Sequence, residues 1–247
     1  MPPRGTRAGI ARKGPENLLF ALVLTGGKGE RLRPLTADRP KPMVPVNDKP
    51  ILQHHLEWLA SSGVTDAVLL CGYKHEAIRA YFGDGGRFGL RISYSLEETP
   101  LGRGGAFKKG FQQVPADEPM VIGTNGDNIN EQPLAPLLKV HRRTGATATV
   151  MLSPLRSPFG FVRLSRGSRV LGFDEKPLLP YWVNAGVYAL NREFFAMLPD
   201  VGDHETTAFP ELAAQGRLHA FKSSAYWKPI DTVKDVTEAA AHLAGQG

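Results

Sequence analysis

The sequence predicts an α/β protein built on a mostly parallel sheet with helices on both faces. Three observations lead to this prediction. Short apolar runs alternate along the chain with stretches of helical periodicity, which is the order of strand–helix–strand units. The first apolar run, residues 18–25, is uninterrupted and ends at Gly26 and Gly27, as expected for a strand buried on both faces. The composition, with 42% hydrophobic and 22% charged residues in 247, is that of a folded globular protein.

In the first half of the chain, helical and strand-like patterns follow one another closely. Pro50 opens a helical pattern that ends at Gly63 and places five residues on one face: Ile51, Leu52, His55, Leu56 and Leu59. Further strands are expected at 66–72, 90–96, 119–127 and 146–152, and helices at 75–82, 104–114 and 134–144. The run 119–127 turns from apolar to polar at its end, which is typical of a strand that delivers residues to a site.

Beyond residue 153 the pattern changes to shorter strands, at 159–165, 168–175 and 182–190. We expect these strands to make the sheet mixed rather than fully parallel. A helix at 206–215, a strand near 218–222 and a helix at 233–244 complete the predicted order.

The net charge of +6 is unevenly distributed. The first 17 residues carry Arg4, Arg7, Arg12 and Lys13 against Glu16, four minus one, which is half of the excess. This stretch is rich in Pro and Gly and has no apolar periodicity, so we predict a disordered basic tail over 1–17. A basic protein can bind nucleic acid, an anionic membrane or a phosphorylated substrate.

Other features narrow the class of protein. The single cysteine, Cys71, excludes a disulfide framework, and its strand context predicts a core residue. The adjacent His54 and His55 point to different sides of a helix and cannot chelate a metal together. No apolar run approaches the ~20 residues of a membrane helix. No helix-turn-helix, zinc or RNA-binding motif accompanies the basic tail, so neither nucleic acid nor membrane is a predicted partner.

A glycine-rich loop follows the first strand and reads Leu24-Thr25-Gly26-Gly27-Lys28-Gly29-Glu30-Arg31-Leu32-Arg33-Pro34. Glycines let backbone N–H groups form an anion cradle, and nearby Arg and Lys side chains hold phosphate oxygens. The P-loop spacing is absent, and Leu32 occupies the third glycine position of a dinucleotide-binding fingerprint. A purely structural turn is the alternative, but Lys28, Arg31, Arg33 and Lys41 favour a phosphate site.

The loop continues through Pro34-Leu35-Thr36 to Pro40-Lys41-Pro42-Met43-Val44-Pro45-Val46. This whole string resembles the signature of the sugar-1-phosphate nucleotidyltransferases, also called NDP-sugar pyrophosphorylases. The resemblance implies a Rossmann-like (GT-A-like) three-layer α/β sandwich with a mixed, mostly parallel central sheet, and a single catalytic domain over 18–247. It also implies transfer of a nucleoside monophosphate from a nucleoside triphosphate to a sugar 1-phosphate, with Mg²⁺ as cofactor.

The resemblance implies roles for the loop and for two later segments. Residues 98–106 are similar to the family's E-x-P-L-G-T-A-G-A segment, with Arg103 where Thr is usual. The Arg103 side chain could reach the triphosphate or face solvent, and we expect it to face solvent. The implied nucleotide-binding residues are Leu24, Thr25, Gly26, Gly27, Gly29, Arg31, Pro100, Gly102 and Gly126.

Two aspartates match the family's metal-binding carboxylates. Asp127 ends the strand 119–127, and Asp231 lies in a segment similar to W-x-D-I-[GD]-T. Either one alone could simply cap a turn, but the pair in matching contexts predicts a Mg²⁺ site. Arg31, Lys41 and Asp127 are the implied catalytic residues, with Arg31 at the leaving pyrophosphate and Lys41 near the α-phosphate.

The sugar phosphate is assigned to the second half of the chain. Residues 173–177 resemble the family's F-x-E-K-P box, in which Glu175 would accept hydrogen bonds from sugar hydroxyls and Lys176 would pair with the phosphate. Asn184 matches the Asn of the N-A-G-[VI]-Y strand, and Gly160 lies where a loop glycine approaches the sugar.

The region 72–106 is most similar to the mannose-1-phosphate guanylyltransferase branch. The alternatives are glucose-1-phosphate thymidylyl- or uridylyltransferases, heptose- or muramate-phosphate nucleotidyltransferases, and a non-catalytic regulatory subunit of the same fold. The expected partners are therefore a nucleoside triphosphate and a sugar 1-phosphate, in the cytoplasm. Formation of a homo-oligomer stays open.

Overall fold

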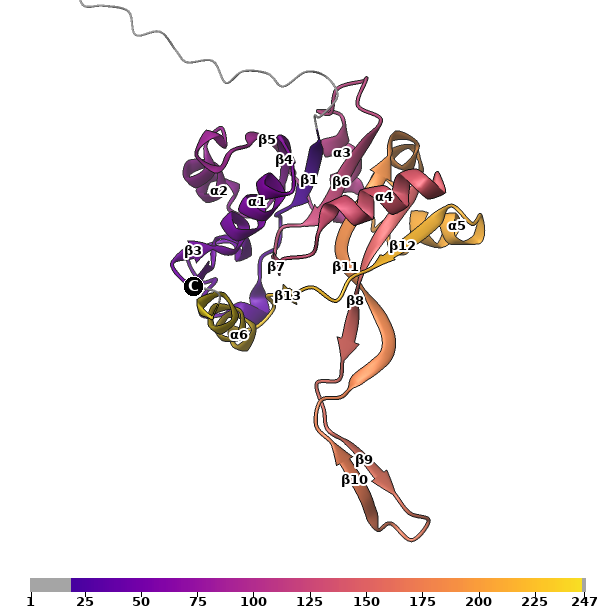
Figure 1. The fold of residues 1–247 in the computed structure, drawn as a ribbon. Helices are drawn as coiled ribbons and strands as arrows, with labels where there is room; N and C mark the ends of the chain where they lie inside the picture. The colour runs from indigo at the N-terminus through magenta and orange to yellow at the C-terminus, as the bar shows by residue number, and fades with distance from the viewer. Residues whose placement is uncertain (1–18, 246–247) are drawn as a thin grey trace, which may run out of the picture.

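The computed structural model describes residues 19–245 and contains a seven-stranded central sheet (Figure 1). Its strands lie in the order β12 (Leu218–Lys222), β8 (Ala148–Arg156), β11 (Leu178–Asn191), β6 (Met120–Asn125), β1 (Phe20–Leu24), β4 (Asp66–Cys71) and β5 (Arg91–Leu96). The pairs β6–β1, β1–β4, β4–β5 and β12–β8 are parallel, whereas β11 is antiparallel to both its neighbours. The predicted mixed, mostly parallel sheet is confirmed.

Within the described residues, the helices that accompany the sheet are α1 (Ile51–Ser61), α2 (His75–Phe82), α3 (Gly102–Phe111), α4 (Leu134–Thr144), α5 (Ala208–Ala214) and α6 (Val233–Ala244). The 3-10 turns are η2 (Glu30–Leu32), η3 (Lys41–Met43), η4 (Gly86–Phe88) and η5 (Arg192–Met197). Three of the predicted helices, 75–82, 134–144 and 233–244, have the predicted bounds. The buried residues of α1 are the five predicted for its apolar face.

The core lies in two layers, one on each face of the sheet. Successive residues of a strand point to opposite faces, so Ala21 and Val23 of β1 join one apolar cluster and Phe20 and Leu22 the other. Helices α1, α2 and α4 pack on the first face, and α3, α5 and η5 on the second. The predicted three-layer sandwich is therefore confirmed.

Two short strands depart from the predicted sheet. β9 (Phe161–Leu164) and β10 (Val170–Asp174) pair only with each other and form a hairpin that projects away from the body (Figure 1). Of the three strands expected to extend the mixed sheet, only β11 does so. β9 and β10 form a separate two-stranded sheet. Because this pair lies apart from the central sheet, its apolar side chains stay exposed.

A small antiparallel pair, β7 (Asn128–Asn130) with β13 (Trp227–Pro229), joins the middle of the chain to its last helix. A hairpin of β2 (Pro45–Val46) and β3 (Lys49–Pro50) precedes α1. These elements enclose a third apolar cluster that includes Leu32, Val44, Ile129 and Ile230.

Two further expectations concern the start of the chain and membrane-spanning helices. The predicted tail, 1–17, lies outside the described residues. Between residues 19 and 245, none of the helices is both long enough and apolar enough to cross a membrane.

Candidate active site

The glycine-rich loop begins where β1 ends, at the carboxyl edge of the sheet. Thr25 is buried, and its hydroxyl donates a hydrogen bond to the Leu70 carbonyl at 2.9 Å. Gly29 has a φ of 68°, and a Cβ at this position would lie 2.8 Å from the Cβ of Lys41. A side chain at residue 29 would therefore push Lys41 out of place, so the loop and Lys41 have to be considered together.

Lys41 lies between two carboxylates. Its Nζ donates to Asp127 Oδ2 and to Asp231 Oδ1, each at 2.7 Å. The Lys41 side chain is 9% exposed, whereas those of Asp127 and Asp231 are 32% and 35% exposed. A buried ammonium thus holds together two carboxylates that solvent and a ligand can reach.

Arg31 adds a second positive charge on the solvent side. Its Nη2 lies 3.1 Å from Asp231 Oδ1, and its side chain is 74% exposed. The guanidinium can swing toward an incoming anion at little cost because exposed ion pairs are weak. Arg31, Lys41, Asp127 and Asp231, predicted to act together, do lie together.

The charges at this site stabilise one another. Burial alone would lower the pKa of Lys41, but attraction to Asp127 and the hydrogen bonds that Lys41 donates to both carboxylates outweigh it and raise the pKa above its ordinary value. Lys41 therefore remains a cation throughout the physiological range. It brings a fixed positive charge to the place where phosphates are predicted to bind.

The backbone explains why carboxylates so distant in sequence meet. Asp127 leads into β7 and Asp231 follows β13, and the Ile230 N–H donates to the Asp127 carbonyl at 3.1 Å. Just after Asp231, Thr232 and Asp235 form a reciprocal capping box that fixes the start of α6. Strand pairing on one side and a helix cap on the other hold Asp231 in position.

The structure offers one observation on a metal ion. Two carboxylate oxygens converge on a single point, which the Lys41 ammonium takes. Oxygen ligands, few of them from protein, suit Mg²⁺ bound together with phosphates and water. Over residues 19–245 no group of three or more His, Cys, Asp or Glu side chains is placed to hold an ion by itself. Asp127 and Asp231 therefore fit Mg²⁺ that arrives with a nucleotide.

Asn184, a predicted sugar-binding residue, lies in β11 two residues before Gly186, which packs against Asn125. The Asn184 Oδ1 accepts from the Gly186 N–H at 2.8 Å, and a Cβ on Gly186 would lie 2.5 Å from the Asn125 amide nitrogen. Asn125 in turn precedes Gly126 and Asp127 in the chain. The β11 segment with Asn184 is therefore packed against the turn that carries Asp127.

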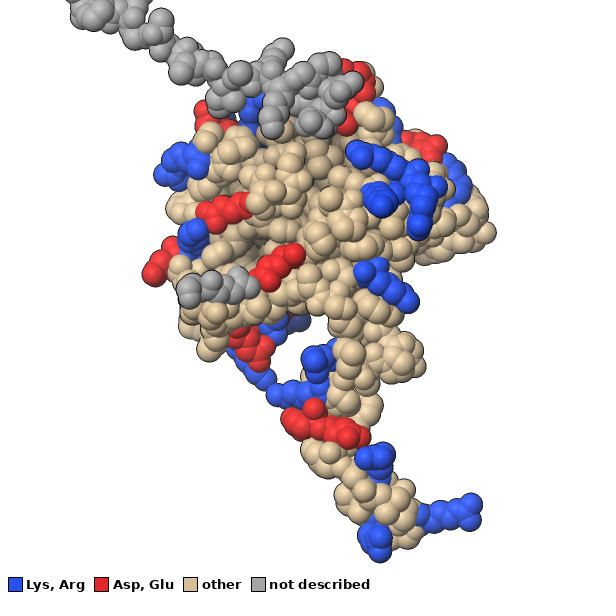
Figure 2. Space-filling view, viewed as in Figure 1, with Lys and Arg blue, Asp and Glu red and all other residues tan. Residues whose placement is uncertain are grey.

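The other predicted sugar-phosphate residues lie at the base of the β9–β10 hairpin. Gly160 precedes β9, Glu175 and Lys176 follow β10, and the base is closed by a 3.0 Å hydrogen bond from the Ser157 N–H to the Pro177 carbonyl. In the described structure Glu175 and Lys176 are exposed and make neither a hydrogen bond nor an ion pair with the two aspartates. Figure 2 shows a hollow between the body and this arm, bordered by acidic and basic side chains.

The predicted nucleotide segment at Pro100 and Gly102 leads into α3. Backbone hydrogen bonds join this segment to the loop that contains Gly202. The Gly202 carbonyl accepts from the Gly104 N–H at 2.8 Å, and the Gly202 N–H donates to the Leu101 carbonyl at 2.8 Å. The Arg103 side chain is 43% exposed, in line with the expectation that it faces solvent, but it also pairs with two carboxylates. Its guanidinium pairs with Asp203 at 3.1 Å and contacts Glu205 more closely still.

The sequence does not reveal the supporting role of two polar residues, His55 and Glu205. His55 is fully buried and bonds the Asn128 carbonyl at 3.3 Å and the Thr124 hydroxyl at 3.1 Å, so it links α1 to both flanks of Asp127. Glu205 accepts from the Asn184 amide at 2.8 Å. Only the polar character of His55 on an apolar helix face could have pointed to such a role.

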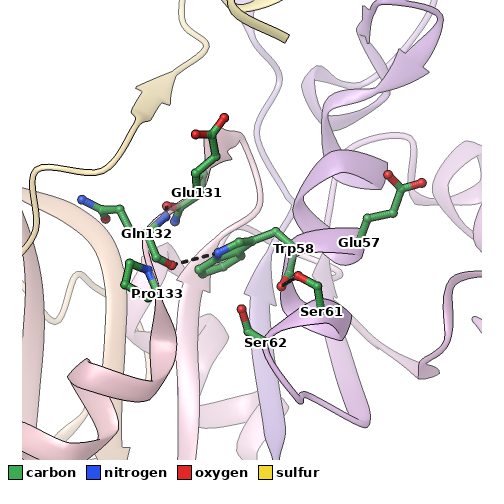
Figure 3. Close-up of a pocket in the computed structure, with 8 residues that line it drawn as sticks. Glu57, Trp58, Ser61, Ser62, Glu131, Gln132 and Pro133 are labelled. Atoms are coloured by element: carbon green, nitrogen blue, oxygen red, sulfur yellow. Dashed lines mark hydrogen bonds between the residues drawn. The ribbon is translucent and has the colours of Figure 1, made fainter. Parts of the chain in front are cut away.

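A separate shallow hollow of about 430 Å³ lies beside the end of α1 (Figure 3). The Trp58 indole N–H crosses it to the Gln132 carbonyl at 3.0 Å. The Gln132 side chain turns away from Trp58 in this view. None of the predicted site residues lines this hollow.

Comparison with known proteins agrees with the fold and the motifs. The nucleotidyl transferase family model matches residues 20–246, and the chain belongs to this family. It is 37% identical over 231 residues to a mannose-1-phosphate guanylyltransferase of Mycobacterium tuberculosis, covering 90% of this chain and 64% of that protein. It is 34% identical to a D-glycero-α-D-manno-heptose 1-phosphate guanylyltransferase of Aneurinibacillus thermoaerophilus, covering 90% and 97% of the two chains.

The crystal structure of HddC from Yersinia pseudotuberculosis has the same fold, with a TM-score of 0.74 at 24% identity over 92% of this chain and all of that one. The chain spans less than two thirds of the length of the mannose-1-phosphate guanylyltransferases that it matches. It matches nearly the full length of the heptose 1-phosphate enzyme.

Proposed function

We propose that this protein is a sugar-1-phosphate nucleotidyltransferase that transfers a guanylyl group to mannose 1-phosphate or a closely related sugar 1-phosphate. The observation that carries the proposal is the convergence of Lys41, Asp127 and Asp231 beside the glycine loop. Positive charge and carboxylates beside the loop that follows a parallel strand suit the binding of a metal–triphosphate complex.

The nucleotide would lie over the loop that follows β1. Backbone N–H groups from Thr25 to Gly29 and the Arg31 guanidinium would hold the β- and γ-phosphates, because exposed N–H groups and Arg bind phosphate oxygens well. The segment at Pro100 and Gly102 would lie along the base. A structure of HddC in complex with GMP-PN supports a guanine nucleotide as the first candidate, although the likeness to this chain is one of fold.

The reaction is an in-line displacement. An oxygen of the sugar phosphate attacks the α-phosphorus, a new P–O bond forms, the bond to the β-phosphate oxygen breaks and pyrophosphate leaves. The attacking phosphate is already anionic at neutral pH, so no general base is needed. Lys41 would neutralise charge at the α-phosphate and Arg31 would hold the departing pyrophosphate.

Asp127 and Asp231 would hold Mg²⁺, which when bound offsets the negative charge that accumulates between the two phosphates. Their remaining exposure leaves them accessible to a metal–nucleotide complex. Lys176 would pair with the sugar phosphate, and Glu175 and Asn184 would hold sugar hydroxyls, with the backbone at Gly160 alongside. The exposed ammonium of Lys176 and carboxylate of Glu175 are available for this. We also propose that the protein acts in the cytoplasm.

The test is a pyrophosphate-release screen of GTP, ATP, UTP and dTTP against mannose, glucose, heptose and N-acetylmuramate 1-phosphates with Mg²⁺. We expect release with GTP and a manno-configured 1-phosphate. Release only with dTTP or UTP and glucose 1-phosphate would replace the guanylyltransferase assignment. No release from any pair would favour a regulatory subunit of this fold.

A further inference from the structure

Arg103 occupies a junction between two parts of the predicted site. It lies in α3, one residue after Gly102 of the nucleotide segment. Its guanidinium reaches across to the 200–205 loop, where it pairs with Asp203 and Glu205. The Arg103 backbone N–H also donates to Asp203 Oδ1 at 2.9 Å. Both backbone and side chain therefore anchor α3 to this loop.

Glu205 connects Arg103 to Asn184, the predicted sugar-binding residue. Its Oε1 accepts from the Asn184 amide at 2.8 Å and from the Tyr188 hydroxyl at 3.2 Å, while its Oε2 faces Arg103. The Asn184 amide also donates to the Tyr188 hydroxyl at 2.9 Å. With its amide hydrogens held in this way, Asn184 has a fixed orientation.

The oxygen of the Asn184 amide is fixed as a result. Because Nδ2 is held by Glu205 and Tyr188, Oδ1 must point the other way, where it accepts from Gly186 next to Asn125. An amide oxygen has two lone pairs, so Oδ1 can accept one more hydrogen bond, from a sugar hydroxyl. Release of Glu205 would let the amide rotate.

We propose that Arg103 is a positioning residue: through Glu205 it fixes the orientation of Asn184 and thereby raises the affinity for the sugar 1-phosphate. It also neutralises the Glu205 carboxylate, which would otherwise repel an anionic substrate in the same region. In this role Arg103 acts through Glu205 and Asn184 rather than by contact with either substrate. The inference rests on the proposed function, in which Asn184 contacts the sugar.

The experiment compares Arg103→Thr, which introduces the residue usual in the family, with Lys108→Thr. Lys108 is on the same helix and pairs with Asp200 at 2.7 Å, outside the Glu205 network. We expect Arg103→Thr to raise KM for the sugar 1-phosphate about tenfold, the effect of about one hydrogen bond, with KM for the nucleotide changed less than about twofold. Lys108→Thr should leave both unchanged, and Arg103→Lys should recover part of the loss.

Unchanged KM values in Arg103→Thr, or equal increases for both substrates, would overturn the inference. A wild-type protein that releases no pyrophosphate with any pair would instead remove the proposed function. In that case a double-mutant cycle in urea still tests the linkage. Arg103→Thr and Asn184→Ala together should lower the unfolding midpoint by less than the sum of their separate effects, and strict additivity would remove the positioning role.

Discussion

The ammonium of Lys41 lies 2.7 Å from the carboxylate of Asp127, although 86 residues separate the two along the chain. Asp231 binds the same nitrogen at the same distance from the other side. The structure therefore places a protein cation between the two carboxylates that would hold Mg²⁺ in the proposed reaction. A metal ion held by both carboxylates would compete with the Lys41 ammonium for these oxygens.

Replacement of Lys41 should consequently improve metal binding in the absence of nucleotide. In Lys41→Met the two carboxylates lose their shared counter-charge and gain a free position for a divalent cation. We expect Mn²⁺ to raise the melting temperature of this variant by roughly 2–4 °C more than that of the wild type, as about 1 kcal/mol of extra binding would do. Thermal unfolding with and without Mn²⁺ measures this. Equal shifts in the two proteins would mean that Lys41 does not compete with the metal.

Asp127→Asn should remove most of the activity while the fold persists. The substitution keeps the shape but removes the charge that would hold Mg²⁺, and the loss of one such electrostatic contact costs ~10²–10³ in rate. Asp231 still pairs with Lys41, so thermal unfolding should change little.

The matched control for that variant is Asp66→Asn. Asp66 pairs with Arg91 at 2.6 Å at the opposite end of β4, so its loss should leave turnover intact. Near-wild-type turnover in Asp127→Asn would take Asp127 out of the mechanism.

Gly29→Ala should impair catalysis through Lys41. The left-handed conformation costs an alanine about 1–2 kcal/mol. In addition, the new Cβ would meet the Cβ of Lys41 at 2.8 Å and displace it. Gly145 ends α4 with a φ of 62°, and a Cβ there would have no other atom within 4 Å, so Gly145→Ala isolates the conformational cost.

We expect Gly29→Ala to lose more stability in urea than Gly145→Ala, because only the Gly29 variant adds a steric clash, and we expect kcat to fall in Gly29→Ala alone. Equal turnover in the two variants would show that the loop tolerates a shifted Lys41.

Acid should destabilise the protein through two buried histidines. Burial lowers the pKa of His55 to about 4, and burial, then the nearby Arg103 charge, lowers the pKa of His204 to about 4. The unfolded chain, with an ordinary histidine pKa of 6.5, binds more protons between pH 6.5 and 4. The stability from each neutral histidine is therefore complete above pH 6.5 and is lost as the pH falls, by about 2 kcal/mol each at pH 5.

His204→Phe tests this directly. His204 is buried among aromatic rings, and neither ring nitrogen has a hydrogen-bond partner in the described structure, so a phenyl ring suits the site. Urea unfolding at pH 7 and pH 5 should reveal a smaller loss on acidification in the variant than in the wild type. An identical loss would assign the acid sensitivity to other groups.

Much of the fold is predictable because it depends on local patterns. The helices at 75–82, 134–144 and 233–244 have the bounds that the sequence predicts, since apolar periodicity and flanking turn residues act over short distances. The β9–β10 hairpin is not predictable in this way, because alternation in a strand does not reveal whether a sheet will accept it.

For the charged cluster at the glycine loop, the sequence points to the residues that meet but not to the contacts between them. Similar motifs point to Lys41, Asp127 and Asp231, but their shared hydrogen bonds depend on how β7 meets β13. The partners of Arg103 lie 100 residues away, and neither pattern nor spacing reports such a pairing. The Arg103 side chain is partly exposed as expected, but tertiary packing also brings two carboxylates to it that the sequence does not reveal.

The pairing of β7 with β13 also sets when the site can form during synthesis. At about 5–20 residues per second, Asp127 leaves the ribosome roughly 5–20 s before Asp231 does, and Lys41 has left earlier still. Throughout that interval β7 has no partner strand and Lys41 has one carboxylate instead of two. We therefore expect the nascent chain to fold much of its sheet first and to gain a complete site only when β13 and α6 have been made.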